Sequence, residues 1–118
     1  MPDIHHRLVM RGSQAEVFSA LTDAVASLAS EMKVLVRTLS FDRDEHVVWR
    51  CVEGPEDWVG TEIAIDLSKA REGTVVRLAH RNWSSATDGL ASCATRWARV
   101  LFGLECFVAF PEPTDTLL

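Results

Sequence analysis

Residues 49–63 read WRCVEGPEDWVGTEI and contain the most informative pattern in the chain. One strand-like run ends near Cys51, and a second run begins at Thr61. Between them stand Gly54 and Pro55, which are typical of turns because proline fixes φ and glycine tolerates backbone angles that other residues avoid. We therefore predict a hairpin in this segment.

The turn of this hairpin also contains three acidic residues and a tryptophan. We interpret Glu53, Glu56 and Asp57 as a solvated loop, because charged side chains are rarely buried without a partner. Trp58 would cap either the end of the core or the mouth of a pocket, since an indole ring suits both positions.

Strand-like patterns continue on both sides of the hairpin. Residues 4–11, 46–53, 61–67 and 74–81 alternate in the way expected of half-buried strands. Residues 32–41 are rich in apolar and β-branched side chains, which also favours a strand. The last four of these runs follow one another with short turns, so we predict an antiparallel meander.

Two other segments have helical spacing. Ser13 and Glu16 form an S-x-x-E capping box at the start of residues 13–30, which make one helix or two. Residues 87–109 place apolar side chains three or four positions apart and predict a long helix that ends before Pro111. The order strand, helix, four strands, helix predicts an α+β fold with both helices on one face of the sheet.

Composition limits the class of protein. The 118 residues are the usual size of one domain, so we treat 1–118 as a single domain. The net charge of -5 argues against a nucleic-acid surface, which needs many cations facing phosphates.

No apolar run approaches the roughly 20 residues that span a bilayer, and the N-terminus lacks the pattern of a signal peptide. Cys51, Cys93 and Cys106 are odd in number and far apart, which fits reduced thiols and a cytoplasmic location.

Four segments carry a family resemblance that covers nearly the whole chain in the right order: residues 12–23 (GSQAEVFSALTD), 47–63 (VVWRCVEGPEDWVGTEI), 74–83 (TVVRLAHRNW) and 93–108 (CATRWARVLFGLECFV). They resemble the START-like superfamily often labelled SRPBCC, and within it the AHSA branch, which is named for homology to an activator of a heat-shock chaperone's ATPase. The resemblance implies a helix-grip fold, in which a curved antiparallel sheet surrounds a long C-terminal helix and leaves an apolar cavity.

The sequence departs from the family pattern at one place in particular. Relatives usually carry two further strands before the segment that matches residues 34–39, but here Leu28 runs almost directly into Met32. We therefore expect about five strands in place of about seven, taking a strand as roughly 5–6 residues plus its turn. The tail FPEPTDTLL also lacks the glycine-rich approach to proline of relatives.

His80 is the candidate best suited to acid–base chemistry, because it shares a face with Val76 and Leu78 that would point toward the cavity. A buried imidazole titrates near neutrality and would serve as an acid or base. The alternative is a core histidine whose ring nitrogens are satisfied by neighbours, and His6 on the first strand has the same two interpretations.

The resemblance also implies a set of ligand-binding residues around the cavity. Trp97 would belong to the core or form the floor of a pocket, and Trp83 would lie at the partly solvated rim of the cavity. The complete set of candidates is His80, Trp83, Trp97, Leu101, Trp49 and Phe18.

Metal, cofactor and nucleophile sites have no support in the sequence. There is no C-x-x-C, no H-x-x-x-H and no G-x-G-x-x-G, so we predict no metal, no cofactor and no assigned catalytic residue. Cys51 and Cys93 stand in apolar rows and are interpreted as small buried hydrophobes.

The C-terminal helix is apolar on several sides near its end. Val100, Phe102 and Phe107 lie off the main apolar stripe of this helix. Such a helix is either gripped tightly by a small sheet or covered by a partner, and we predict a homodimer through this surface.

Three functions from different classes follow. The first is non-catalytic binding of a small hydrophobic ligand between the sheet and the C-terminal helix. The second is a polyketide cyclase-like enzyme that uses His80 as an acid or base. The third is a protein-interaction module, either chaperone-associated or dimeric.

Overall fold

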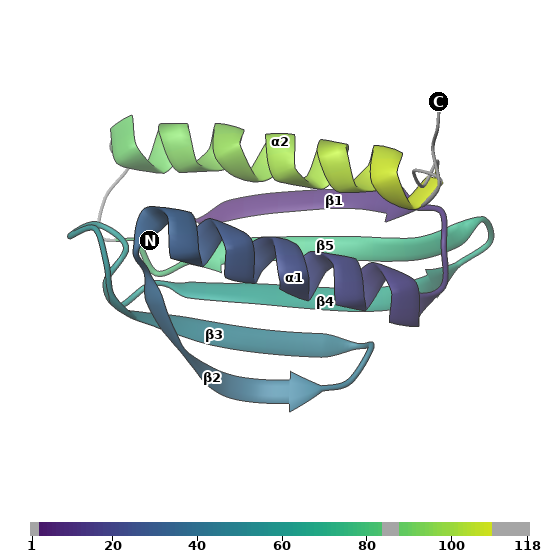
Figure 1. The fold of residues 1–118 in the computed structure, drawn as a ribbon, viewed down its shortest axis with the longest axis horizontal. Coiled ribbons are helices and arrows are strands. Elements are labelled where there is room, and N and C mark those ends of the chain that lie inside the picture. The colour runs from purple at the N-terminus through teal and green to yellow at the C-terminus, as the bar shows by residue number, and fades with distance from the viewer. Residues whose placement is uncertain (1–2, 84–87, 110–118) are drawn as a thin grey trace, which may run out of the picture.

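The computed structural model describes residues 3–83 and 88–109, with the side chains of 105–109 excepted. The elements are, in order, β1 (Ile4–Met10), α1 (Gln14–Met32), β2 (Leu35–Asp42), β3 (His46–Glu53), β4 (Glu62–Ala70), β5 (Gly73–Arg81) and α2 (Asp88–Ala109). The five strands form one antiparallel sheet in the order β1-β5-β4-β3-β2. Both helices lie on the same face of this sheet (Figure 1), which confirms the predicted α+β architecture and strand count.

The first helix is one continuous element because its ends are well capped. The Ser13 hydroxyl accepts a hydrogen bond from the Glu16 backbone, and the Glu16 carboxylate accepts one from the Ser13 backbone, as the capping box predicted. At the other end Lys33 takes a left-handed conformation with φ 57°, and the Val34 amide donates to Ala29. The helix therefore includes Met32, and the prediction of a strand from residue 32 was wrong at that boundary.

The segment 49–63 is the predicted hairpin between β3 and β4. The Cys51 amide donates to the Thr61 carbonyl at 2.9 Å, and the Gly60 amide donates to the Cys51 carbonyl at 2.8 Å. Gly54 has φ +149°, a backbone conformation that other residues rarely adopt. The three acidic side chains of the loop are exposed, as expected: Glu53, Glu56 and Asp57.

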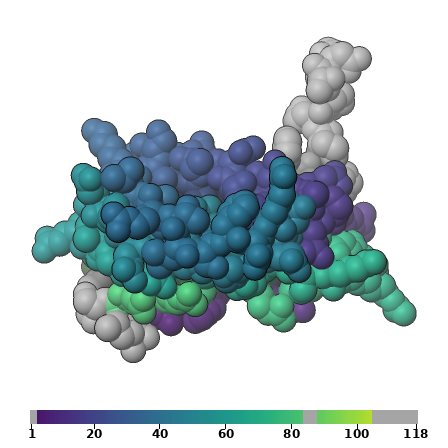
Figure 2. All heavy atoms as spheres, turned by 90° about the horizontal axis from the view of Figure 1, so that it is seen from below, coloured from purple at the N-terminus to yellow at the C-terminus, as the bar shows by residue number. Residues whose placement is uncertain are grey.

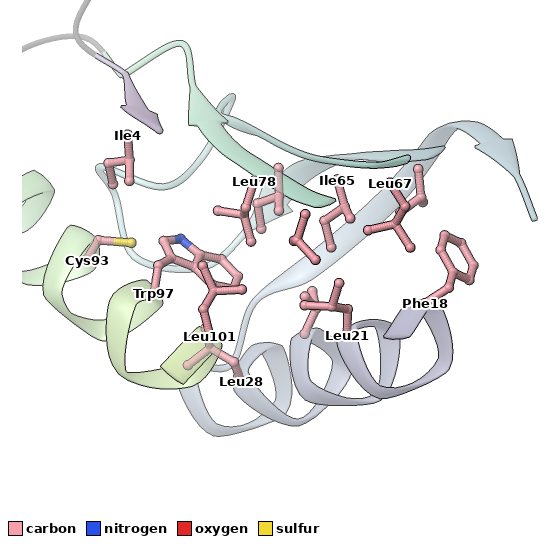
Figure 3. Packing of buried hydrophobic residues seen from close by; sticks show 14 of the residues in the cluster. Ile4, Phe18, Leu21, Leu28, Ile65, Leu67, Leu78, Cys93, Trp97 and Leu101 are labelled. Carbon is pink, nitrogen blue, oxygen red and sulfur yellow. The ribbon is translucent and has the colours of Figure 1, made fainter. Parts of the chain in front are cut away.

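The core lies between the sheet and the two helices (Figure 3). Strands β4 and β5 contribute inward-facing side chains such as Ile65 and Leu78, which are at most 1% exposed. Leu21 of α1 and Trp97 of α2 pack against them from the side of the helices. Each fully buried aliphatic or aromatic side chain of this kind stabilises the fold by about 1.5–3 kcal/mol.

Replacing Ser13 with alanine tests the capping of α1. We expect Ser13→Ala to lower the free energy of unfolding by about 1 kcal/mol, because the Glu16 amide loses its acceptor. Urea denaturation followed by circular dichroism measures this change. The control is Ser27→Ala, an exposed mid-helix position where alanine is favourable; equal loss in both variants would contradict the capping role.

Candidate functional site

A cluster of aromatic rings surrounds His80 at one end of the core. The His80 side chain is 0% exposed, and its ring centroid lies 4.7 Å from that of Trp83, 4.8 Å from Trp58 and 6.0 Å from Trp97. Three of the predicted ligand-binding residues are therefore brought together here, and Trp58 joins them. We call these four residues the His80 cluster.

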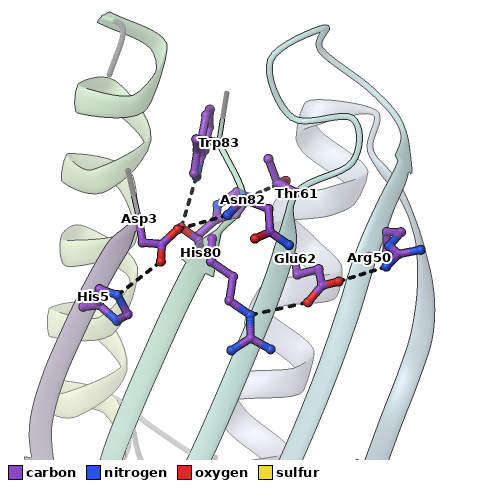
Figure 4. A network of polar contacts seen from close by, with 9 residues as sticks. Asp3, His5, Arg50, Thr61, Glu62, His80, Asn82 and Trp83 are labelled. Atoms are coloured by element: carbon purple, nitrogen blue, oxygen red, sulfur yellow. Dashed lines mark hydrogen bonds and ion pairs between the residues drawn. The ribbon is translucent and has the colours of Figure 1, made fainter. Parts of the chain in front are cut away.

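Both ring nitrogens of His80 have partners (Figure 4 shows the Thr61 side). The Trp97 indole N–H donates to His80 Nδ1 at 3.0 Å, and the Cys93 sulfur lies 3.5 Å from the same nitrogen. An indole only donates, so Nδ1 is the acceptor and Nε2 carries the proton. His80 Nε2 then donates to Thr61 Oγ1 at 2.8 Å, and the Thr61 hydroxyl donates to the Trp58 carbonyl.

Burial determines the charge state of this cluster. It lowers the pKa of His80 to about 4, so the imidazole is neutral near pH 7. Burial also raises the pKa of the Cys93 thiol to about 12, which keeps the sulfur protonated. The Nδ1 lone pair of His80 accepts the hydrogen bond from Trp97, and the ring is neutral near pH 7. His80 therefore has the geometry of a core histidine whose nitrogens are both hydrogen-bonded, which is the second of the two interpretations above.

Trp83 does not lie at the partly solvated rim of a cavity. Its side chain is 1% exposed, and its indole N–H donates to the His80 carbonyl at 3.1 Å. The prediction of a rim position was wrong, because the end of β5 turns the ring back onto His80 and Trp58. Leu101 is likewise in the core at 2% exposed, and His6 is held through Nε2 by the Ala94 carbonyl at 3.1 Å.

The remaining two candidates, Phe18 and Trp49, line a different space. An open groove of about 800 Å³ lies between α1 and the strands β2 and β3. Phe41 stands edge-on to Phe18 with ring centroids 5.7 Å apart, and it is 57% exposed. The rest of this aromatic groove is formed by Ala15, Ser19, Thr22, Thr38, Arg43 and Asp44.

Phe41 was not predicted as a site residue, because its direction depends on a β-bulge. Thr38 pairs with Trp49, but the register then shifts so that Ser40 pairs with Val48 and Phe41 with Val47. In a regular strand, Phe41 would face away from Thr38. The extra residue turns it to the helix side.

A smaller cleft reaches the outside of the His80 cluster. It has a volume of about 170 Å³ and is lined by residues that include Trp58 and Cys93 but not His80. Among the residues that the structure describes, no group of three or more histidine, cysteine, aspartate or glutamate side chains is placed to hold a metal ion. No helix in the described ranges is long and apolar enough to cross a membrane.

Solved structures with the same architecture identify the fold. The Aha1 dimer from Colwellia psychrerythraea matches with a TM-score of 0.78 at 25% identity, over 96% of this chain and 100% of that one. An AHSA1-like protein from Rhizobium etli matches with a TM-score of 0.72 at 19% identity, over 99% of this chain and 89% of that one. This chain has an AHSA-like SRPBCC fold.

A third structure shares the AHSA-like SRPBCC fold at lower identity. DynU16, from the dynemicin biosynthetic locus, matches with a TM-score of 0.70 at 12% identity, over 96% of this chain and 49% of that one. No family model and no curated protein sequence matches the chain significantly.

The sequence predicts that the C-terminal helix carries apolar side chains outside its main apolar stripe. Phe102 of α2 is 58% exposed and Val100 is half-buried, while the Phe107 side chain lies outside the described residues. Arg96 and Arg99 are exposed on the same helix. The described part of α2 therefore presents one large exposed apolar side chain.

The neutral state of His80 predicts a pH dependence of stability. Its pKa is lower in the folded protein, about 4, than the ordinary value of 6.5, so the unfolded chain binds more protons between these values. We expect stability to be complete above pH 6.5 and to fall by roughly 3 kcal/mol as the pH falls toward 4. Urea denaturation at a series of pH values measures this loss.

The matched variants for this experiment are His80→Gln and His5→Gln. The first removes the titrating ring, so the slope between pH 6.5 and about 4 should flatten even though the variant is less stable throughout. The second changes an exposed histidine and should keep the slope. An unchanged slope in His80→Gln would show that another group causes the pH dependence.

Proposed function

We propose that this protein binds a small hydrophobic ligand without transforming it, and that the aromatic groove is the binding site. The observation that carries the proposal is the contrast between the two candidate regions. The side chains of the His80 cluster fill the space between the sheet and α2, whereas Phe18, Phe41 and Trp49 line an open groove. An AHSA-like SRPBCC fold is a ligand-binding fold, which supports the same conclusion.

The composition of the aromatic groove fits a small ligand with an apolar body. Its volume of about 800 Å³ falls within the roughly 300–1,000 Å³ of small-molecule sites. The three aromatic rings supply apolar contact, and the hydroxyls of Thr22 and Thr38 can orient a polar group. Burial of apolar surface would therefore drive binding, and a few polar contacts would select the ligand.

The enzymatic alternative has less support. A polyketide cyclase-like reaction needs a base in contact with its substrate, and His80 is fully buried with Nδ1 and Nε2 both engaged. Likeness to DynU16 at 12% identity supports the shared fold and no reaction. Binding without chemistry is therefore the function that the geometry favours.

We also infer that the chain forms a homodimer. The Colwellia psychrerythraea relative is a dimer and covers nearly the whole of this chain, which supports the assignment. A chaperone partner, which the AHSA branch name implies, and the α2 surface as the dimer contact stay predictions. So does the cytoplasmic location, which the buried free thiols of Cys51 and Cys93 support.

Filling the aromatic groove tests the binding proposal. Isothermal titration calorimetry with dodecanoate, an apolar probe, should detect binding to the wild-type protein. We expect Thr22→Trp to weaken this binding by about tenfold or more, because the indole occupies the groove. The matched control is Thr95→Trp on the exposed side of α2, which should bind like the wild type.

Either of two results would overturn the assignment of the groove. One is equal dodecanoate affinity in the wild type and Thr22→Trp. The other is loss of binding in Thr95→Trp alone, which would place the ligand beside α2. Absence of any binding to the wild type would count against a hydrophobic ligand of this size.

A further inference from the structure

The strand β2 has an exposed edge. It ends the sheet order, and no described strand pairs with its outer side. Leu35, Leu39 and Phe41 are 54%, 44% and 57% exposed, and most of the strand has the same character. Figure 2 shows the β2 region across the front of the molecule, with no other described segment in front of it. Such an edge offers unpaired backbone N–H and C=O groups to another strand.

No comparable surface occurs on the described part of α2, whose side chains are described up to residue 104. Its described part exposes a single large apolar side chain, Phe102, and it also carries the exposed cations of Arg96 and Arg99. A helix also has its backbone groups paired internally, so it can offer only side chains. The β2 edge offers both apolar side chains and backbone hydrogen bonds.

We infer that β2 pairs with β2 of a second copy of this chain, antiparallel about a two-fold axis, and that the second copy completes the aromatic groove. The inference rests on the homodimer and on the groove proposed above. It assigns the dimer contact to β2 in place of the α2 surface expected from the sequence, and it adds a residue of the second copy to the ligand site.

The two faces of β2 restrict how the copies can align. Opposite residues in an antiparallel pair point to the same side of the sheet, so residues facing the helices must meet each other. The partners of β2 in β3 identify these faces: Val36, Thr38 and Phe41 face the helices, and Arg37, Ser40 and Asp42 face away.

One alignment that respects these faces is also complementary in charge. Placing Arg37 opposite Asp42 of the second copy creates the same pair twice, because the axis is two-fold. Neither residue forms an ion pair within the described part of the chain, so both are free to do so. Opposite charges across a strand pair stabilise it, and like charges destabilise it.

The same alignment connects the dimer to the aromatic groove. It sets Thr38 opposite Phe41 of the second copy on the side that faces the helices. Thr38 lines the groove, so the second phenyl ring would lie at its open side. The exposed side chain of Phe41 in each copy would thus be covered by the aromatic groove of the other copy.

Charge reversal tests the alignment. Analytical ultracentrifugation at micromolar concentration measures the dimer dissociation constant of the wild type, Arg37→Asp, Asp42→Arg and the double variant. Each single variant places like charges opposite each other twice and should weaken the dimer by about 30-fold. The double variant restores both opposite-charge pairs and should return the constant to near the wild-type value.

Control variants separate the possible interfaces. Arg71→Asp makes the same charge change in an exposed turn and should leave the dimer unchanged. If Arg37→Asp and Asp42→Arg dimerise like the wild type, the β2 alignment is wrong while the homodimer stands. Loss of the dimer in Phe102→Ser alone would then place the contact on α2.

The aromatic groove gives a second readout. Dodecanoate affinity should fall together with dimerisation in the single variants and recover in the double variant. Unchanged affinity in a monomeric Arg37→Asp would remove the shared site and leave the groove of one copy as the binding site. A wild type that is monomeric throughout would overturn both the homodimer and the β2 pairing.

Discussion

The imidazole of His80 connects three parts of the chain that are far apart in sequence. A buried polar ring is tolerated only when its nitrogens are hydrogen-bonded, because each unmet group costs about 1–3 kcal/mol. The partners come from α2 through Trp97 and from the β3–β4 hairpin through Thr61. The position of the long helix over the sheet and the position of the hairpin loop therefore depend on one side chain.

This arrangement explains why the interior and the groove differ in character. In the His80 cluster, every described buried side-chain polar atom has a partner and the rings are in contact, so the space is occupied. At the other edge of the sheet, β2 is the last described strand. No described strand lies beyond β2, so Phe18 and Trp49 border open space.

Local signals in the sequence predicted most of the fold, but they did not predict the contacts that depend on register. Ser13 and Glu16 marked the start of α1 because a capping box needs only four adjacent residues. The end of α1 was missed because Lys33 takes a left-handed conformation that glycine usually adopts. Thr61 and His80 meet only when two strands and a loop are aligned, and the bulge in β2 reversed the direction of Phe41.

The distribution of tryptophans has a spectroscopic consequence. Trp58, Trp83 and Trp97 are at most 4% exposed, and Trp49 alone is half-buried beside the groove. The chain contains no tyrosine, so its ultraviolet emission comes almost entirely from these four indoles. The protein therefore carries one intrinsic chromophore at the surface between α1 and β3 and three that report only on the interior.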